Sequence, residues 1–274
     1  MSGHGSVDPS ALVATAVAIA GEAGALLAGF AEQRADGADL EVSTKTSTTD
    51  PVSEADRAAE RLIAQRLLER RPDDGLLAEE DQAARRGTTG LRWVVDPLDG
   101  TVNFLYGIPQ WCVSVACEDE AGALVAVVHD PNRDETFQAV RGGGALLDGR
   151  PLAVTQVTTL AEALVATGFA YDPAVRIDQG RVVATLLGDV RDVRRAGSAA
   201  LDLAWMAAGR FDAYVEFGLA PWDWAAGRLL VTEAGGRATD RTATLGERRL
   251  AGLVASGPAV HDALLARVDG VVRP

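Results

Sequence analysis

Hydrophobic positions in the first quarter of the chain repeat at helical spacing and predict two helices. The first is expected after Asp8, which suits an N-cap, and Pro9, which suits the first helical position. Its packed side is marked by Leu12, Ile19, Leu26 and Phe30. The second is expected from about Ser53 to Arg71, where Pro72 stops it. The polar stretch 41–51 between them is expected to form an exposed loop or hairpin.

Short apolar runs bounded by turn residues predict a series of strands further on. In the first half they are expected at residues 76–78, 93–95, 113–117, 124–128 and 136–140, with a hairpin connection at 118–122. In the second half, strands are expected at 164–167, 190–194, 213–216 and 253–255. Helices are expected at 179–187 and 198–208, and from about Trp222 and Ala259. This alternation predicts a layered α/β fold.

The pattern contains no repeat, low-complexity segment or obvious linker, and therefore predicts one continuous unit. We expect a flexible N-terminus over residues 1–8 and a single unit over residues 9–274. Within this unit, an N-terminal α+β half is expected over about 9–150 and a C-terminal α/β half over about 151–274. With 47% hydrophobic residues, a chain of 274 residues can fill a substantial core.

Charge and cysteine content narrow the classes of protein that remain. The 39 acidic against 26 basic residues give a net charge of −13, which argues against nucleic acid or an anionic membrane as the main partner. The apolar run 11–31 looks like an export signal or membrane span, but no Lys or Arg precedes Arg34 and Glu22 interrupts the run, so a packed helix is expected. Cys112 and Cys117 are expected to be buried free thiols, which fits a reducing cytoplasm.

The most informative segment is WVVDPLDGTVNF at residues 93–104. A hydrophobic strand leads into Asp96, Pro97 is expected to prevent the strand from continuing, and Asp99 follows beside Gly100 and Thr101. Open α/β sheets bind ligands at the carboxyl ends of their strands. Two carboxylates there suit Mg²⁺ rather than zinc, and the neighbouring backbone N–H groups suit an anion nest. From these residues alone, an ordinary Asp-Gly turn with capping acids remains the alternative.

Further acids lie, like Asp96 and Asp99, at the ends of expected strands or helices. Glu79 and Glu80 follow the apolar residues 75–78 and place a carboxylate pair at a second strand end; a solvated charged turn is the alternative. Asp223 lies between Trp222 and Trp224 at the start of an expected helix. An acid among such bulky apolar neighbours needs a hydrogen bond or a cation to stay ionised, although simple helix capping is also consistent with its position.

The two most specific motifs resemble the signatures of the inositol monophosphatase family. Residues 93–104 are similar to its W-x-x-D-P-[LI]-D-G-T-x-N-F signature, and WDWAAG at 222–227 is similar to its second signature. The similarity extends in family order to residues 50–56, 78–80, 197–199 and 212–216. The resemblance implies a layered α-β-α-β-α sandwich of the sugar phosphatase type, shared with fructose-1,6-bisphosphatase. It also implies a Mg²⁺-dependent phosphoric monoester hydrolase.

The resemblance further implies a set of metal ligands. The first Mg²⁺ is expected to be held by Glu79, Asp96 and the backbone carbonyl of Leu98. The second is expected to be shared by Asp96, Asp99 and Asp223. A third, weaker ion is expected to bind mainly through water and the Glu79 carboxylate. Two or three Mg²⁺ ions and sensitivity to lithium are therefore expected.

The same resemblance implies catalytic and substrate-binding residues. The attacking water is expected to be activated by metal together with Thr101, whose hydroxyl pairs with Asp56; Glu79 is the alternative base. Lys45 and Asp50 belong to a loop that closes over the metals in relatives, although a solvated loop charge is equally consistent with Lys45. Substrate contacts are expected from Asp99, Gly100, Thr101, Gly197, Ala199 and Glu216.

The identity of the substrate rests on fewer residues. A carboxylate at Glu216 suits a polyol, and the small residues at 197–199 favour a compact ring, so inositol 1-phosphate ranks first. Histidinol phosphate, fructose 1,6-bisphosphate and 3′-phosphonucleotides are the alternatives, and a nonenzymatic regulatory or scaffold protein is the alternative of another class. Two positions depart from the family, Val102 in place of a second Thr and Phe169 in place of a small polar residue. A homodimer with no nucleic-acid or membrane partner is expected.

Overall fold

The computed structural model describes residues 8–35, 42–44, 51–79 and 85–272, with the backbone alone at 42–44 and 51–53. The N-terminal residues 1–7, the loop residues Lys45 and Asp50, and Glu80 lie outside the described residues. Both expected N-terminal helices are confirmed, as α1 (Pro9–Ala35) and α2 (Glu54–Arg70). Asp8 caps α1, because its Oδ1 accepts a hydrogen bond of 2.9 Å from the N–H of Ser10. Between the helices, β1 (Val42–Thr44) and β2 (Pro51–Ser53) pair as a short antiparallel ladder.

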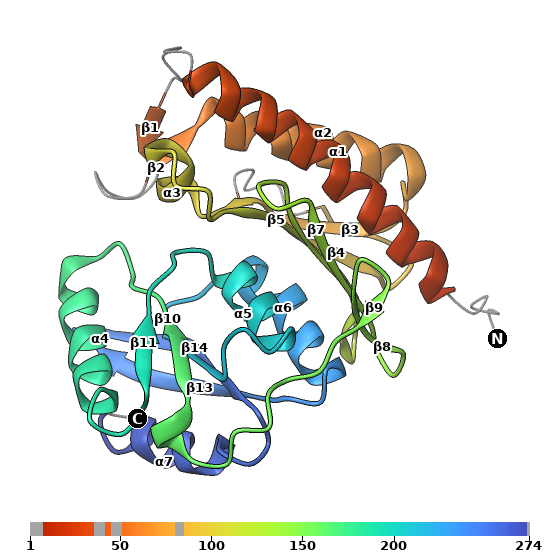
Figure 1. The fold of residues 1–274 in the computed structure, drawn as a ribbon. Helices are drawn as coiled ribbons and strands as arrows, with labels where there is room; N and C mark the ends of the chain where they lie inside the picture. Colours follow the sequence, from red (N-terminus) through yellow and green to blue (C-terminus); the bar gives the residue numbers. More distant parts are fainter. Residues whose placement is uncertain (1–7, 36–41, 45–50, 80–84, 273–274) are drawn as a thin grey trace.

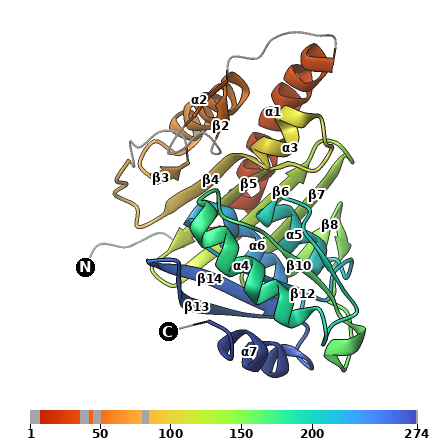
Figure 2. The ribbon, with the colours of Figure 1, turned by 90° about the vertical axis from the view of Figure 1, so that its left-hand side faces the viewer.

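Two sheets and three helical layers form the expected α-β-α-β-α sandwich (Figure 1). Helices α1 and α2 cover one face of a seven-stranded sheet in the order β3 to β9, and α5 (Ala199–Ala207) and α6 (Pro221–Glu233) cover the other, as Figure 2 also shows. This sheet contains β3 (Gly75–Ala78), β4 (Arg92–Asp99), β5 (Cys112–Asp119), β6 (Gly122–Asp130), β7 (Glu135–Val140), β8 (Gly144–Leu147) and β9 (Arg150–Pro151). Within this sheet, the described residues pair in parallel only between β3 and β4.

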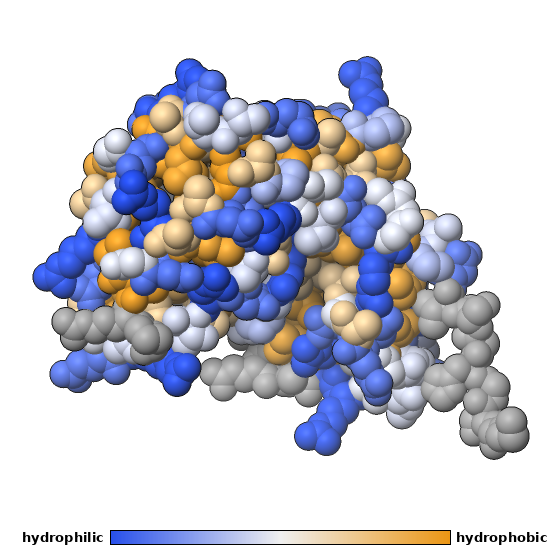
Figure 3. All heavy atoms as spheres, turned by 90° about the horizontal axis from the view of Figure 1, so that it is seen from below, coloured by the Kyte–Doolittle hydropathy of each residue, from blue (hydrophilic) through white to orange (hydrophobic). Residues whose placement is uncertain are grey.

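The second sheet has five strands in the order β11-β10-β12-β14-β13, with parallel pairing of β10 to β11 and β12. Its strands are β10 (Leu164–Thr167), β11 (Asp192–Arg194), β12 (Ala213–Phe217), β13 (Arg237–Leu245) and β14 (Arg248–Ser256). Helices α4 (Pro173–Leu186) and α7 (His261–Asp269) form the outermost layer against it. On the face seen from below, apolar side chains lie in separate spots among polar ones (Figure 3), which is typical of an ordinary protein surface.

Alternating side chains of the central strands enter two different cores. In β4, Trp93 and Val95 pack under α1 and α2, whereas Val94 faces the core around α5 and α6. Strands β5 and β6 divide in the same way, so that both faces of the sheet are buried. This explains why these strands appear in the sequence as continuous apolar runs rather than as alternating ones.

Several boundaries differ from the expectation. The prediction that Pro97 prevents the strand from continuing is wrong, because β4 runs on to Asp99 through a register shift between Asp96 and Asp99. A bulge accommodates a proline, which has no N–H to donate to the ladder. Helix α4 begins six residues before the expected start, because Asp172 caps it through the N–H of Ala174 and Pro173 occupies its first position. Strands β8, β9 and β13 were not expected; β13 is too polar to stand out.

Helix α1 is long and apolar enough, by length and composition, to cross a membrane. In the structure its Leu12, Ile19 and Leu27 side chains are buried against the sheet and α2. The charge that interrupts it, Glu22, pairs with Arg66 at 2.5 Å and with a second arginine of α2. The helix therefore serves as a core element of the fold. Cys112 and Cys117 are free and buried, as expected.

Candidate active site

A cavity of about 940 Å³ lies where the carboxyl end of β4 faces α5, α6 and β12. Most of the residues expected at the site line it together: Glu79, Asp96, Leu98, Asp99, Gly100, Thr101, Gly197, Ala199, Glu216 and Asp223. Seven of its lining residues are acidic and three are arginines. The cavity is thus strongly acidic, and this does not suit a phosphate anion unless cations accompany it.

The end of β4 is shaped by local hydrogen bonds. Asp96 Oδ1 accepts a 2.9 Å hydrogen bond from the N–H of Leu98. This bond stabilises the backbone of the bulge and holds the Asp96 carboxylate in its orientation. Gly100 follows in the left-handed region with φ 102°, and a Cβ there would approach the carbonyl oxygen of Gln110 at 2.9 Å. Only glycine fits this turn without strain. Helix α3 (Thr101–Tyr106) begins directly after it, so the first N–H groups of the helix are presented at the cavity.

Thr101 and Asp56 meet at the edge of the cavity although 45 residues separate them. The Thr101 Oγ1 atom lies 2.9 Å from Asp56 Oδ1 and 3.1 Å from the carbonyl oxygen of Leu98. Both side chains are buried. Because the hydroxyl hydrogen is directed to one of these acceptors, the oxygen of Thr101 keeps its lone pairs for a donor in the cavity.

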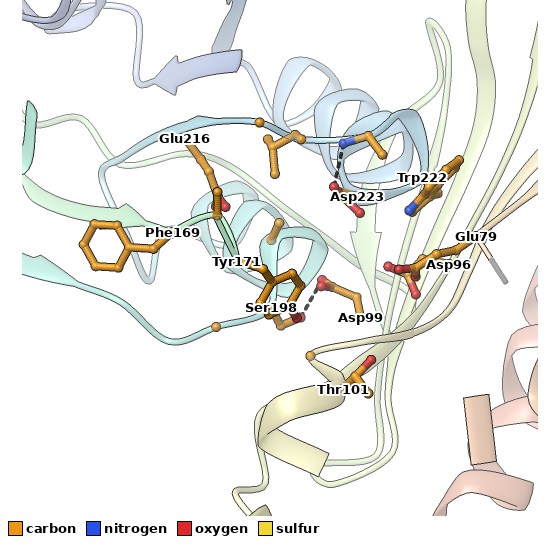
Figure 4. Close-up of a pocket in the computed structure, with 18 of the residues that line it drawn as sticks. Glu79, Asp96, Asp99, Thr101, Phe169, Tyr171, Ser198, Glu216, Trp222 and Asp223 are labelled. Atoms are coloured by element: carbon orange, nitrogen blue, oxygen red, sulfur yellow. Dashed lines mark hydrogen bonds between the residues drawn. The ribbon is translucent and has the colours of Figure 1, made fainter. Parts of the chain in front are cut away.

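Figure 4 shows how the four acids are arranged. Glu79 and Asp96 lie next to each other. Asp99 points to the start of α5, where its Oδ2 accepts 2.7 Å hydrogen bonds from the Ser198 hydroxyl and the N–H of Ala200. Asp223 caps α6, with its Oδ2 2.7 Å from the N–H of Ala220. Capping is therefore one of its functions.

Burial raises the pKa of Asp96, Asp99 and Asp223, and the negative charges around them raise it further. The pKa of Asp99 rises to about 6 because burial outweighs the hydrogen bonds from Ser198 and the backbone. The pKa values of Asp96 and Asp223 lie well above the ordinary range, first through burial and then through the charge of Glu79. The described part of the site thus holds more negative charge than its own cations compensate.

The donor set fits a hard divalent cation. Carboxylates and the Leu98 carbonyl are the oxygen ligands that Mg²⁺ prefers. Among the described residues, no three acid, His or Cys side chains already converge as a closed metal-binding group. Asp99 and Asp223 instead turn to neighbouring N–H and hydroxyl groups. A cation that enters the cavity has carboxylates on several sides of it, and their raised pKa values indicate that positive charge stabilises their ionised form.

The opposite side of the cavity is built around Glu216. Its Oε2 accepts a 2.6 Å hydrogen bond from the hydroxyl of Tyr214, and burial raises its pKa to about 7. Gly168 makes room for this carboxylate, because a Cβ there would overlap it. Gly197 has φ 101°, and a Cβ there would lie 2.6 Å from Nη1 of Arg195. The two glycines therefore leave space for the side chains of Glu216 and Arg195.

Sequence reasoning missed several residues of the cavity. Ser198 holds Asp99, and it could have been found because it lies between two residues that were singled out. Asp202 lies one turn further along α5 and carried no motif of its own. Arg57, Arg195 and Arg248 supply the positive charge of the cavity lining, and only the fold brings them to it. Phe169 lines the cavity but points away from the acids (Figure 4).

The layered sandwich and the acid-lined cavity define an α/β phosphatase, a phosphoric monoester hydrolase. Residues 8–272 match the sequence model of the inositol monophosphatase family. The chain belongs to that family.

Individual relatives agree with this assignment. The chain is 41% identical over 275 aligned positions to inositol-1-monophosphatase SuhB of Mycobacterium tuberculosis, which covers 96% of this chain and 94% of the relative. It is 40% identical over 230 positions to Nus factor SuhB of Escherichia coli, with 84% and 86% covered. The crystal structure of extragenic suppressor protein SuhB from Bartonella henselae superposes with a TM-score of 0.86 at 36% identity, covering 94% of this chain and 98% of that one.

Proposed function

We propose that the protein hydrolyses a small phosphate monoester with Mg²⁺ and water, and that inositol 1-phosphate is the first candidate substrate. The observation that carries this proposal is the meeting of Glu79, Asp96, Asp99 and Asp223 in one cavity beside the Thr101–Asp56 hydrogen bond. The name of the M. tuberculosis relative supports the choice of substrate.

The acids have a defined role in this proposal. Glu79, Asp96 and the Leu98 carbonyl hold a first Mg²⁺, and Asp96, Asp99 and Asp223 hold a second; a third, weaker ion binds mainly through water and Glu79. Bound Mg²⁺ supplies positive charge that neutralises the phosphate and lowers the pKa of water. Binding requires the carboxylates to be ionised, so a proton that the raised pKa retains on Asp96 must leave first.

The remaining residues orient the reactants. Thr101 donates its hydrogen to Asp56, so its oxygen can accept a hydrogen from the attacking water and hold that water in line with the phosphorus. Asp56 makes this oxygen a better acceptor. The backbone N–H groups at Gly100 and the start of α3 bind phosphate oxygens. The hydrogen bond between Thr101 and Asp56 favours Thr101 over the alternative base, Glu79, which lies beside Asp96.

The leaving group then lies between the phosphate and Glu216. Glu216 accepts hydrogen bonds from ring hydroxyls, and Gly197 and Ala199 leave room for a compact ring. Histidinol phosphate is the second candidate, because the same carboxylate suits its ammonium group. Fructose 1,6-bisphosphate and 3′-phosphonucleotides follow, because both are larger than the compact ring that the small residues at 197–199 favour.

A regulatory role has independent support in the name of the E. coli relative, a Nus factor. Such a role does not require the acids and the Thr101–Asp56 pair to meet in an open cavity. The decisive experiment is phosphate release from the four candidate substrates with and without Mg²⁺, and with added lithium. Mg²⁺-dependent release that is fastest with inositol 1-phosphate supports the proposal. No release from any of them would leave the regulatory role as the better explanation.

The proposed assembly is a homodimer, as the family resemblance implies. Light scattering at micromolar concentration is expected to give about twice the monomer mass of 28.6 kDa. The monomer mass would contradict this expectation without affecting the proposed reaction.

A further inference from the structure

One acid of the cavity has no part in the chemistry described so far. Asp202 lies in the first turn of α5 and lines the cavity, yet only 1% of its surface is exposed. Among the described residues, its Oδ1 atom has no hydrogen-bond partner. Buried polar atoms of native proteins nearly always have partners, so an orphaned carboxylate oxygen at a cavity wall requires an explanation.

The surroundings of Asp202 make its burial costly. Its pKa lies well above the ordinary range, first because of burial and then because of the charges of Glu216 and Asp99. The positive charge that acts on it comes from Arg195, which also acts on Glu216. Arg195 is exposed and lines the cavity, and within the described part of the chain no ion pair joins it to either acid. The start of α5 offers a favourable helix dipole, but a dipole does not supply the missing donor.

Asp202 and Glu216 thus present two carboxylates to the same side of the cavity. The Tyr214 hydroxyl already occupies one oxygen of Glu216. Asp202 has no such internal donor on Oδ1. A site that is left with an unpaired buried acceptor discriminates strongly in favour of a ligand that supplies the donor.

We propose that Asp202 is a specificity-determining residue that, together with Glu216, selects leaving groups carrying several hydrogen-bond donors. The inference rests on the proposed phosphatase function and specifies the chemistry of its substrate. The donors are either ring hydroxyls or an ammonium group, and the acceptors are the two carboxylates. Asp202 contacts the leaving group and not the reacting phosphorus, so it affects the choice of substrate more than the chemical step.

The test compares three phosphate monoesters in the presence of Mg²⁺. Inositol 1-phosphate carries hydroxyl donors, histidinol phosphate carries an ammonium group, and cyclohexyl phosphate has a similar ring without donors. Asp202→Ala is expected to lower kcat/KM about tenfold for the preferred donor-bearing substrate and less than about twofold for cyclohexyl phosphate. Asp148→Asn is the matched control: it removes one charge outside the cavity and keeps the oxygen that accepts from the Thr136 N–H. It is expected to leave all three rates unchanged.

Asp202→Asn distinguishes the two kinds of donor. Asparagine still accepts a hydrogen bond from a hydroxyl but has no charge to attract an ammonium group. A loss within about threefold on inositol 1-phosphate indicates hydroxyl donors, whereas a loss of about tenfold on histidinol phosphate indicates the ammonium group. Because asparagine is nearly isosteric and removes a buried charge, the variant is expected to melt at or above the wild-type temperature.

The possible outcomes distinguish a failure of the proposed role of Asp202 from a failure of the proposed phosphatase function. Equal losses on all three substrates, or no loss on any, would overturn the role of Asp202. A large fall in the melting temperature of Asp202→Asn would assign Asp202 to the fold and would overturn it as well. If the wild-type protein releases no phosphate from any of the three with Mg²⁺, the proposed phosphatase function fails instead.

Discussion

Acids are buried at both ends of strands β3 and β4, but only at the amino end do neighbouring donors compensate the buried charge. At the amino end, Asp74 is 1% exposed and accepts hydrogen bonds from Arg71 at 2.7 Å, Thr89 at 2.6 Å and the indole N–H of Trp93 at 2.9 Å. Burial raises its pKa, but these hydrogen bonds, with Arg71 foremost, lower it by more, and the pKa lies below its ordinary value. Asp74 is a fully satisfied structural acid.

At the carboxyl end of the same strands, Asp96 is equally buried but faces Glu79, Asp99 and Asp223. Burial raises its pKa, and the neighbours raise it further because they repel its charge, so the pKa of Asp96 moves in the opposite direction to that of Asp74. The comparison shows that burial alone does not mark a functional acid. What marks it is burial without enough internal donors, since such an acid is stable in its ionised form only when a cation arrives.

Replacing Asp by Asn should therefore lower activity at the carboxyl end of the strands and lower stability at the amino end. Asp99→Asn and Asp223→Asn are expected to lower kcat about a thousandfold or more, equivalent to about 4 kcal/mol, because each removes a proposed metal ligand. Phosphate release measures the loss, and melting curves without Mg²⁺ should show stability equal to or above that of the wild type. More than about a tenth of the wild-type activity in either variant would rule out that residue as a metal ligand.

Asp74→Asn is the counterpart at the amino end. It is expected to lower the free energy of unfolding by about 3 kcal/mol, because Arg71 loses its ion pair and one acceptor of a buried network disappears. Denaturant unfolding measures this, and kcat should stay within about twofold of the wild type. If Asp74→Asn instead abolished activity in a stable protein, the division between structural and functional ends would be wrong.

Thr101→Val tests the role of a hydroxyl group at the carboxyl end of β4 without changing a charge. Valine keeps the shape of threonine but cannot orient water or donate to Asp56, so kcat is expected to fall about a hundredfold. Thr101→Ser retains the hydroxyl and should stay within about fivefold. If valine and serine behave alike in a kinetic assay, the base must be sought elsewhere, with Glu79 the first candidate.

The smallest expected effect concerns pH and Mg²⁺. The folded-state pKa of Asp99, about 6, exceeds the ordinary 3.8, so its protonated form contributes stability that is complete below about pH 4 and is lost as pH rises through about 6. Mg²⁺ competes with that proton. The rise in melting temperature on adding Mg²⁺ should therefore be about 3–5 °C larger at pH 8 than at pH 5. An equal rise at both values would show that Mg²⁺ does not bind these acids.

The sequence by itself determined the layered fold and five of the seven acids that line the cavity. Helical spacing fixed α1 and α2, and the apolar runs fixed the central strands. The motif at residues 93–104 fixed Asp96, Asp99 and Thr101 as neighbours, because four or five residues of chain cannot separate them far. Only the bulge at Pro97 was missed there, since a proline that ends a strand and one that sits in a bulge have the same local pattern.

Only the tertiary structure decided which buried acids have hydrogen-bond donors or positive charges beside them to compensate their negative charge. The hydrogen bond from Ser198 to Asp99 joins residues 99 positions apart, and the bond from Trp93 to Asp74 joins residues 19 apart. The unpaired oxygen of Asp202 is likewise visible only once β12 and α5 enclose it. No local pattern encodes these relations, because the free energy of a buried charge depends on every donor and charge that the folded chain brings around it.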